Sequence, residues 1–176
     1  MISELLKQRI LKIKLILIDN DGVLTDGRIV FGDYGDELKF FDVQDGHGLV
    51  MLKRAGLVSV IVSGKKSRIN TRRAKEVEVA KVYQNVHDKL KLLPKILSKF
   101  RATHEETCYI GDDLVDIPVM KRVGFSVAVK NAVPEVKEAA HYVTDRWGGR
   151  GAVRETADLV LKTQGKWDEV TRRYFK

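Results

Sequence analysis

The chain has 176 residues, of which 44% are hydrophobic and 32% are charged. This composition is typical of a single globular domain and excludes a disordered or fibrous chain. The net charge of +8 at pH 7 leaves two kinds of partner open, nucleic acid or a small anionic substrate.

The distribution of the basic residues argues against nucleic acid. They are spread along the chain, and short clusters such as 64–68 and 71–75 have no interleaved aromatic residues of the kind that stack on bases. No apolar run approaches the roughly 20 residues of a membrane-spanning helix, so no membrane contact is expected. Residues 1–14 lack a signal-peptide pattern and Cys108 has no partner for an internal disulfide, so we expect a cytoplasmic protein.

Short apolar runs alternate along the chain with segments that have helical spacing. In chain order we predict a strand at 14–18, a β-hairpin at 28–46, a helix at 48–56, a strand at 58–62, a helix at 67–78, a strand at 81–83, a helix at 87–100, a strand at 107–110, a helix at 116–124, strands at 125–129 and 141–143, and helical material over 156–175. Runs that are apolar at nearly every position suit strands buried on both faces. The pattern predicts a doubly wound α/β fold with a mostly parallel sheet.

The whole chain, 1–176, is interpreted as one such domain. The hairpin is a small insertion at about 28–44, and a tail rich in Gly and Arg begins at about 146 and runs to 176. The spacings between the strands leave no room for a separate cap domain.

Polar residues follow four of the predicted strands, at the sheet edge where ligands bind in this class of fold. They are Asp19 and Asp21 after the first strand, Ser63, Gly64 and Lys65 after 58–62, Lys89 after 81–83, and Asp112, Asp113 and Asp116 after 107–110. Taken singly, each is typical of a helix cap or a solvated loop. Together, three or more carboxylates with a hydroxyl and a lysine predict a Mg²⁺ site that handles phosphate.

The segments DNDGVLTDG, VSGKKS, DK and GDDLVD occur in the order of the four signature segments of the haloacid dehalogenase superfamily of phosphohydrolases, which this chain resembles. A closer likeness, carried by DGVLTDG, DGHGL, GDDLVDIPVM and GGRGAVRE, is to the members that dephosphorylate 3-deoxy-D-manno-octulosonate 8-phosphate (KDO 8-phosphate) in lipopolysaccharide precursor synthesis.

The resemblance implies a role for each matching residue. Asp19 would be the nucleophile that forms an aspartyl-phosphate, and Asp21 would be the general acid and base. Ser63 and Lys89 would bind the phosphoryl oxygens. Asp19, the main-chain carbonyl of Asp21 and Asp112 would hold Mg²⁺, and Asp113 or Asp116 would support them.

The resemblance also implies an anionic sugar-phosphate substrate and a homotetramer in which the tail of one subunit covers the site of a neighbour. Candidate substrate-binding residues are Gly46, Gly48, Gly64, Lys65, Arg73 and Arg150. Two positions depart from the common pattern: Asn20 stands where an apolar residue is frequent, and Lys65 stands where Arg is frequent. Because Lys cannot make the bidentate contact of Arg, a carboxylate contact at Lys65 is less secure.

Other functions fit parts of the same pattern. The substrate could be another acid-sugar phosphate, such as a sialic-acid-type 9-phosphate, or a broad range of small phosphate esters. A phospho-acceptor signalling module also surrounds Mg²⁺ with acids and a lysine, but it places the acceptor on a later strand and lacks a hairpin. A catalytically weak regulatory piece is disfavoured because Asp19, Asp21 and Asp112 are all present.

Overall fold

The computed structural model describes residues 2–176. Six parallel strands form the main sheet in the order β5-β4-β1-β6-β7-β8. These strands are β1 (Leu15–Ile18), β4 (Val58–Val62), β5 (Lys81–Tyr83), β6 (Thr107–Gly111), β7 (Phe125–Ala128) and β8 (Tyr142–Val143). The doubly wound parallel sheet predicted from the sequence is thereby confirmed.

Strand β1 lies at the centre of the sheet because every one of its side chains is apolar and buried. Leu17 aligns with Val60 of β4 on one side and with Tyr109 of β6 on the other. The chain leaves β1 toward β4 and leaves β6 toward β7, so the direction of winding changes between β1 and β6. This is the position at which doubly wound sheets open a ligand-binding crevice.

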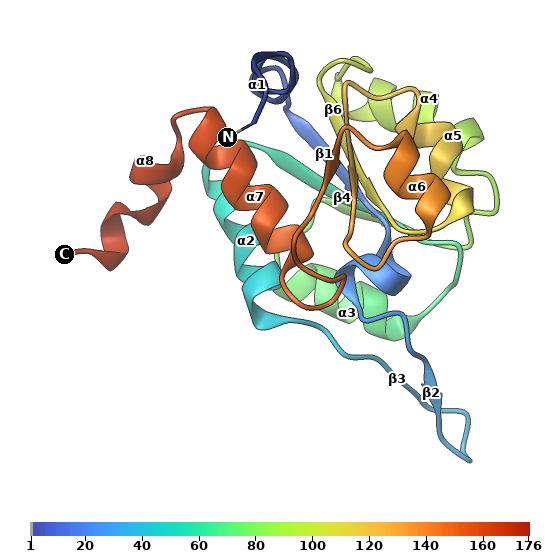
Figure 1. Ribbon diagram of the computed structural model, residues 1–176. Helices are drawn as coiled ribbons and strands as arrows, with labels where there is room; N and C mark the ends of the chain where they lie inside the picture. The colour runs from blue at the N-terminus through green and yellow to red at the C-terminus, as the bar shows by residue number, and fades with distance from the viewer. Residues whose placement is uncertain (1) are drawn as a thin grey trace.

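Helices cover both faces of the sheet, with α2 and α7 on one face and α4, α5 and α6 on the other (Figure 1). The helices are α1 (Glu4–Leu11), α2 (Val43–Arg54), α3 (Arg68–Glu76), α4 (Lys89–Phe100), α5 (Ile117–Met120), α6 (Pro134–Ala139), α7 (Ala152–Thr163) and α8 (Trp167–Thr171). None of those within residues 2–176 is long and apolar enough to cross a membrane.

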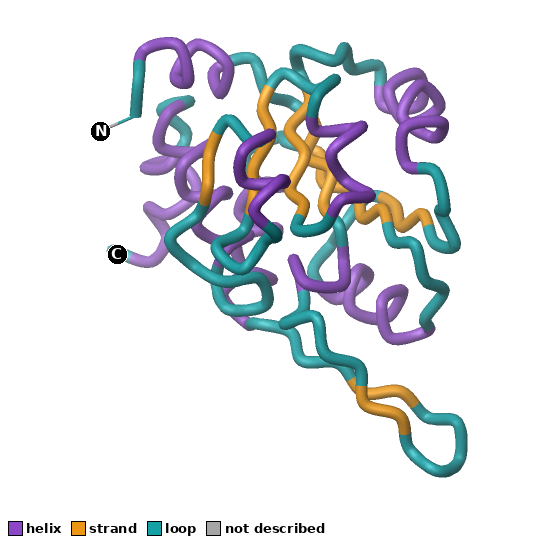
Figure 2. Tube along the Cα trace, turned by 45° about the vertical axis from the view of Figure 1, so that its right-hand side comes forward, coloured by secondary structure: helices purple, strands orange, loops and turns teal. Residues whose placement is uncertain are grey.

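The hairpin pairs β2 (Val30–Phe31) with β3 (Glu37–Leu38) and projects away from the body of the molecule (Figure 2). Its predicted end at residue 46 is wrong, because Asp42 caps the first turn of α2 by accepting a hydrogen bond from the Gln44 N–H at 2.6 Å. Helix α2 therefore begins at Val43 and takes up residues 43–46.

The predicted helical run at 156–175 is also corrected. It starts earlier, at Ala152, and it breaks at Gly165, whose φ of +68° ends α7 before α8 begins. Helices α1 and α6, of eight and six residues, were not predicted.

Candidate active site

The first half of the site is the loop that follows β1. Asp19 continues the pairing of β1 by donating its N–H to the carbonyl of Ile110 at 3.0 Å, and its side chain is nearly buried. The chain then turns sharply through Asn20–Leu24, where Gly22 adopts a φ of +93° that favours glycine. A Cβ at Gly22 would lie 2.0 Å from Oδ2 of Asp112, so this glycine lets the loops after β1 and β6 meet.

The loop after β6 is fixed by Asp116, whose carboxylate is fully buried. Its Oδ1 accepts the Tyr109 hydroxyl at 2.6 Å, and its Oδ2 accepts the N–H groups of Asp112 and Asp113 at 2.9 and 3.2 Å. Such charge-assisted bonds hold the loop in one conformation. Asp116 thus holds the backbone at Asp112 in place, and its support of a metal ligand stays a prediction.

Lys89, the first residue of α4, neutralises part of this negative charge. Its Nζ lies 2.9 Å from Oδ1 of Asp19 and 2.7 Å from Oδ1 of Asp116, and only 4% of its side chain is exposed. Burial disfavours the charged form of Lys89, but the two carboxylates outweigh that effect and raise its pKa. One ammonium group therefore faces two carboxylates, with a third at Asp112.

The acids are arranged to accept a divalent cation. Asp19, Asp112 and Asp116 each offer a carboxylate oxygen within 4.8 Å of the others. Since Asp116 is already saturated by its hydrogen bonds, Asp19 and Asp112 are the candidate ligands among the three. Oδ1 of Asp112 is buried without a hydrogen-bond partner, as expected for an oxygen that coordinates a cation. Hard oxygen donors of this kind suit Mg²⁺. Coordination by the main-chain carbonyl of Asp21 stays a prediction.

The crowding of the carboxylates changes their protonation. Burial, and after it the nearby Asp19, Asp116 and Asp113 carboxylates, raise the pKa of Asp112 to about 8. Burial and the Asp116 charge raise the pKa of Asp19 to about 6, in spite of Lys89.

We expect the metal-free protein to lose stability as the pH rises from about 4 to about 8. In this range the folded state holds protons on Asp19 and Asp112 that the unfolded chain has released. As the pH rises, the folded state must lose these protons and bring the negative charges close together, which lowers its stability relative to the unfolded chain. Mg²⁺ should remove the penalty, so the rise in Tm on adding Mg²⁺ should be larger at about pH 8 than at about pH 5. Thermal unfolding with chelator or with Mg²⁺ at both values measures this, and an equal rise at both would contradict it.

A cavity of about 310 Å³ opens over these groups at the carboxyl edge of the sheet. It brings together most of the predicted site residues, together with three that the sequence did not indicate. The lining residues are Asp19, Asp21, Gly64, Lys65, Val86, His87, Lys89, Asp112, Asp113 and Val115. Val86 and His87 follow β5 at the same edge, so their position after a strand was the signal that could have identified them.

Ser63 directly precedes the lining residues Gly64 and Lys65 and is fully buried. Its hydroxyl donates to the Lys65 carbonyl at 3.1 Å and accepts the Lys65 N–H at 3.2 Å. The side chain thus stabilises the turn that carries Gly64 and Lys65, and its contact with a phosphoryl oxygen stays a prediction.

Gly46 and Gly48 do not line this cavity, and their contact with substrate stays a prediction. Both lie inside α2, where a Cβ on Gly46 would be 2.4 Å from Nη2 of Arg73 and one on Gly48 would be 3.2 Å from Cα of Arg154. These glycines let α3 and α7 pack closely against α2.

Arg73 is likewise absent from the cavity of its own chain. Its Nη2 donates to the Asp42 carbonyl at 2.9 Å, its Nη1 lies 3.2 Å from Glu76, and its guanidinium stands 5.7 Å from the centre of the Phe41 ring. Within one chain, Arg73 therefore joins α3 to the start of α2 and has no access to a ligand at Asp19.

The segment 148–151, which contains Arg150, packs against the loop after β1 of the same chain. The Gly149 N–H donates to the Val23 carbonyl at 2.8 Å, and a Cβ on Gly148 would lie 1.7 Å from the Gly22 oxygen. Arg150 is exposed and lines a different hollow, so it is not brought to the cavity at Asp19. The contact of this segment with a neighbouring subunit stays a prediction.

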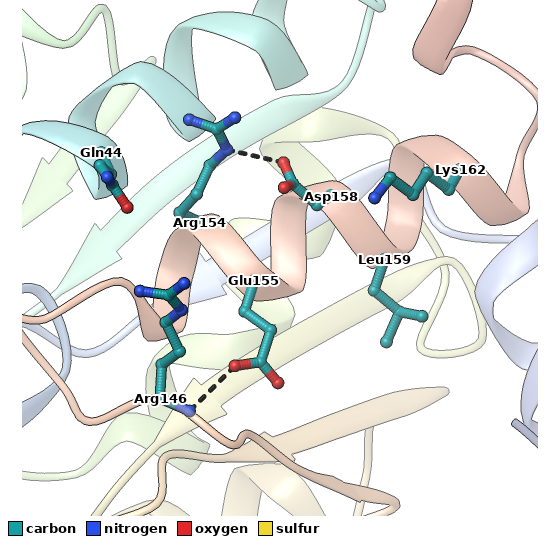
Figure 3. Close-up of a pocket in the computed structure, with 7 residues that line it drawn as sticks. All are labelled: Gln44, Arg146, Arg154, Glu155, Asp158, Leu159 and Lys162. Atoms are coloured by element: carbon teal, nitrogen blue, oxygen red, sulfur yellow. Dashed lines mark hydrogen bonds and ion pairs between the residues drawn. The ribbon is translucent and has the colours of Figure 1, made fainter. Parts of the chain in front are cut away.

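A larger hollow of about 500 Å³ lies along α7, where the carboxylates of Asp158 and Glu155 are already bonded (Figure 3). Arg154 Nε donates to Asp158 at 2.7 Å, and the Arg146 N–H donates to Glu155 at 2.9 Å. It has no cluster of unpaired carboxylates comparable to the one at Asp19. We therefore assign the chemistry to the smaller cavity.

The fold and this cavity define an α/β enzyme in which several carboxylates meet at the switch point of a doubly wound sheet. Residues 54–152 match the haloacid dehalogenase-like hydrolase family, and the chain belongs to that family. It is thus a hydrolase, which favours an enzyme over the phospho-acceptor module.

Several relatives of the chain are named as phosphatases. The 3-deoxy-D-manno-octulosonate 8-phosphate phosphatase of Yersinia pestis is 43% identical over 93% of this chain and 88% of its own length. The crystal structure of a probable YrbI family phosphatase from Pseudomonas syringae has a TM-score of 0.96 at 43% identity and covers 99% of both chains. The structure of the Moraxella catarrhalis 3-deoxy-D-manno-octulosonate 8-phosphate phosphatase, in complex with magnesium, phosphate and KDO, has a TM-score of 0.93 at 37% identity and covers 96% of this chain and 97% of its own.

Proposed function

We propose that this protein is a Mg²⁺-dependent phosphatase that hydrolyses KDO 8-phosphate to KDO and inorganic phosphate, a step in making lipopolysaccharide precursors. The observation that carries the proposal is the meeting of Asp19, Asp112 and Lys89 around one cavity at the switch point of the sheet. The similarity to relatives named for this reaction, one of them holding magnesium, phosphate and KDO, supports the choice of substrate.

In the proposed reaction, an oxygen of Asp19 attacks phosphorus and the bond from phosphorus to the sugar oxygen breaks. Asp21 gives its proton to the departing sugar oxygen and then takes a proton from the water that attacks the aspartyl-phosphate. This second step releases phosphate and restores both carboxyl groups.

The remaining polar groups would orient the nucleophile and stabilise the negative charge of the phosphoryl group. Lys89 keeps Asp19 oriented and offers its positive charge to the phosphoryl oxygens, while Lys65 reaches the cavity from the opposite loop. Asp19 and Asp112 would hold the cation, which when bound would supply positive charge for the negative phosphoryl group. The bond network of Asp116 would keep Asp112 in position for this.

The test is the release of inorganic phosphate from KDO 8-phosphate and from a panel that includes a sialic-acid-type 9-phosphate and simple hexose phosphates, with Mg²⁺ or with chelator. The proposal requires a clear preference for KDO 8-phosphate in kcat/KM and loss of activity in chelator. Preference for another acid-sugar phosphate, or no preference, would replace the substrate but not the reaction class.

We further propose that the enzyme works as a homotetramer joined through its hairpins, with the tail of one subunit near the site of its neighbour. The hairpin exposes large apolar side chains, among them Phe31, Tyr34 and Phe40. Such a patch on a projecting element is typical of an interface. The mass in solution, measured by light scattering, tests this assembly.

A further inference from the structure

Lys39 is unusual among the residues of the hairpin because its side chain points back into the protein. Phe31 of β2 and Tyr34 of the turn are exposed, but the Lys39 side chain is fully buried. Its Nζ lies 2.6 Å from Oδ1 of Asp21 and 3.3 Å from Glu37. The sequence pattern does not indicate this contact, because the hairpin separates the two residues by 18 positions.

Two buried asparagines complete the surroundings of Asp21. Asn20 donates from Nδ2 to Oδ1 of Asp21 at 3.0 Å and to Oδ1 of Asn70 at 3.0 Å. Lys39 Nζ is also 3.4 Å from Oδ1 of Asn70, so the same amide oxygen orients both donors. Asn20 and Asn70 are fully buried, and buried polar groups are costly unless they are hydrogen-bonded, as Asn20 Nδ2 and Asn70 Oδ1 are to each other.

All the hydrogen bonds that reach the Asp21 carboxyl from residues 2–176 end on Oδ1. Asp21 also lines the cavity. When all donors bind one oxygen of a carboxyl group, its second oxygen stays available for a reacting group. This is the arrangement that orients a carboxylate for proton transfer.

We propose that Lys39 is a positioning residue for Asp21: from the base of the hairpin it fixes the carboxyl that exchanges protons with the substrate oxygen, with Asn20 and Asn70 in support. The proposal rests on the proposed function, since it presumes that Asp21 is the acid and base. Lys39 does not line the cavity, so it acts through Asp21 and does not touch the substrate. The hairpin is thereby part of the catalytic apparatus of its own chain.

The test compares two substrates in single-turnover experiments with Lys39→Met. The alkoxide that leaves KDO 8-phosphate needs a proton, whereas the nitrophenolate that leaves p-nitrophenyl phosphate is stable without one. Lys39→Met should slow sugar release by about 10- to 100-fold, a part of the full contribution of a general acid. It should leave the rate of nitrophenolate release and the KM for KDO 8-phosphate unchanged, and Lys39→Arg should restore most of the lost rate.

The controls separate positioning from a general effect on folding. Lys53→Met removes another lysine–carboxylate pair, to Glu78 at 2.6 Å on the surface, and should change neither rate. In an Asp21→Asn background, Lys39→Met should cause no further loss, because the two residues act as a unit. Lys39→Gln provides the same comparison if Lys39→Met does not fold.

Equal slowing of both substrates, or losses that multiply in the double variant, would overturn the role of Lys39. A wild-type protein that releases phosphate from neither substrate would instead overturn the proposed function. The two failures are therefore distinguishable.

Discussion

Asp19→Asn should abolish phosphate release while the protein stays folded. The neutral amide cannot attack phosphorus, and removal of a nucleophile typically costs on the order of 10⁴-fold or more in kcat. The substitution also removes one of the carboxylates that crowd around Lys89, and burial already raises the pKa of this one to about 6. The Tm in chelator should therefore stay the same or rise at neutral pH, as a thermal unfolding curve beside the phosphate assay would measure.

Asp33→Asn is the matched control, because Asp33 lies in the exposed turn of the hairpin. It should change neither activity nor Tm. If Asp19→Asn kept a substantial fraction of the wild-type rate, the nucleophile would have to be another group. If it lost activity together with a large fall in Tm, the loss could not be assigned to chemistry.

The part of the site that the sequence predicted is the part made at strand ends. Parallel strands that are apolar throughout must be buried, and their carboxyl ends must share one edge of the sheet. The acids after β1 and β6 and the lysine after β5 therefore had to come together, and the cavity at Asp19, Lys89 and Asp112 follows from chain order alone.

The placements that the sequence could not indicate lie where residues distant in the sequence pack on one another. Gly46 must be small because Arg73 of α3 packs against it, and Gly48 because Arg154 of α7, about a hundred residues later in the chain, packs against it. Arg73 matches the pattern of a ligand-binding arginine, yet its guanidinium is taken up by the Asp42 carbonyl. Such contacts depend on how the helices pack together, which local propensity and periodicity do not encode.

Lys39 was missed for a different reason. A lysine at the end of an exposed hairpin strand normally stays in solvent. Its burial depends on an acceptor group formed by Asp21 and Asn70, which belong to two other elements. The departure at Asn20 was noted in the sequence, but its partner Asn70, 50 residues away, could be found only in the fold.

Lys89→Met should be the most destabilising single change at the site, and its cost should grow with pH. The side chain is 4% exposed and pairs with both Asp19 and Asp116, so its removal leaves buried carboxylates without a counter-charge. Breaking a buried pair in this way typically costs about 3–5 kcal/mol. The folded state of the variant must then hold its carboxylates protonated, which raises their pKa further, so stability should fall as the pH rises. Phosphate release should also be lost, because Asp19 and the phosphoryl group both lose the positive charge of the Lys89 ammonium.

Urea unfolding in chelator at about pH 5 and about pH 8 measures this dependence. Lys95→Met, an exposed position on the same helix α4, is the control and should be neutral at both values. Mg²⁺ should recover part of the stability that Lys89→Met loses, because the cation offsets the same carboxylates that Lys89 neutralises. A loss equal at both pH values, and unaffected by Mg²⁺, would mean that Lys89 stabilises the fold by packing its apolar stem. The charge balance that links Lys89 to Asp19 and Asp116 would then be wrong.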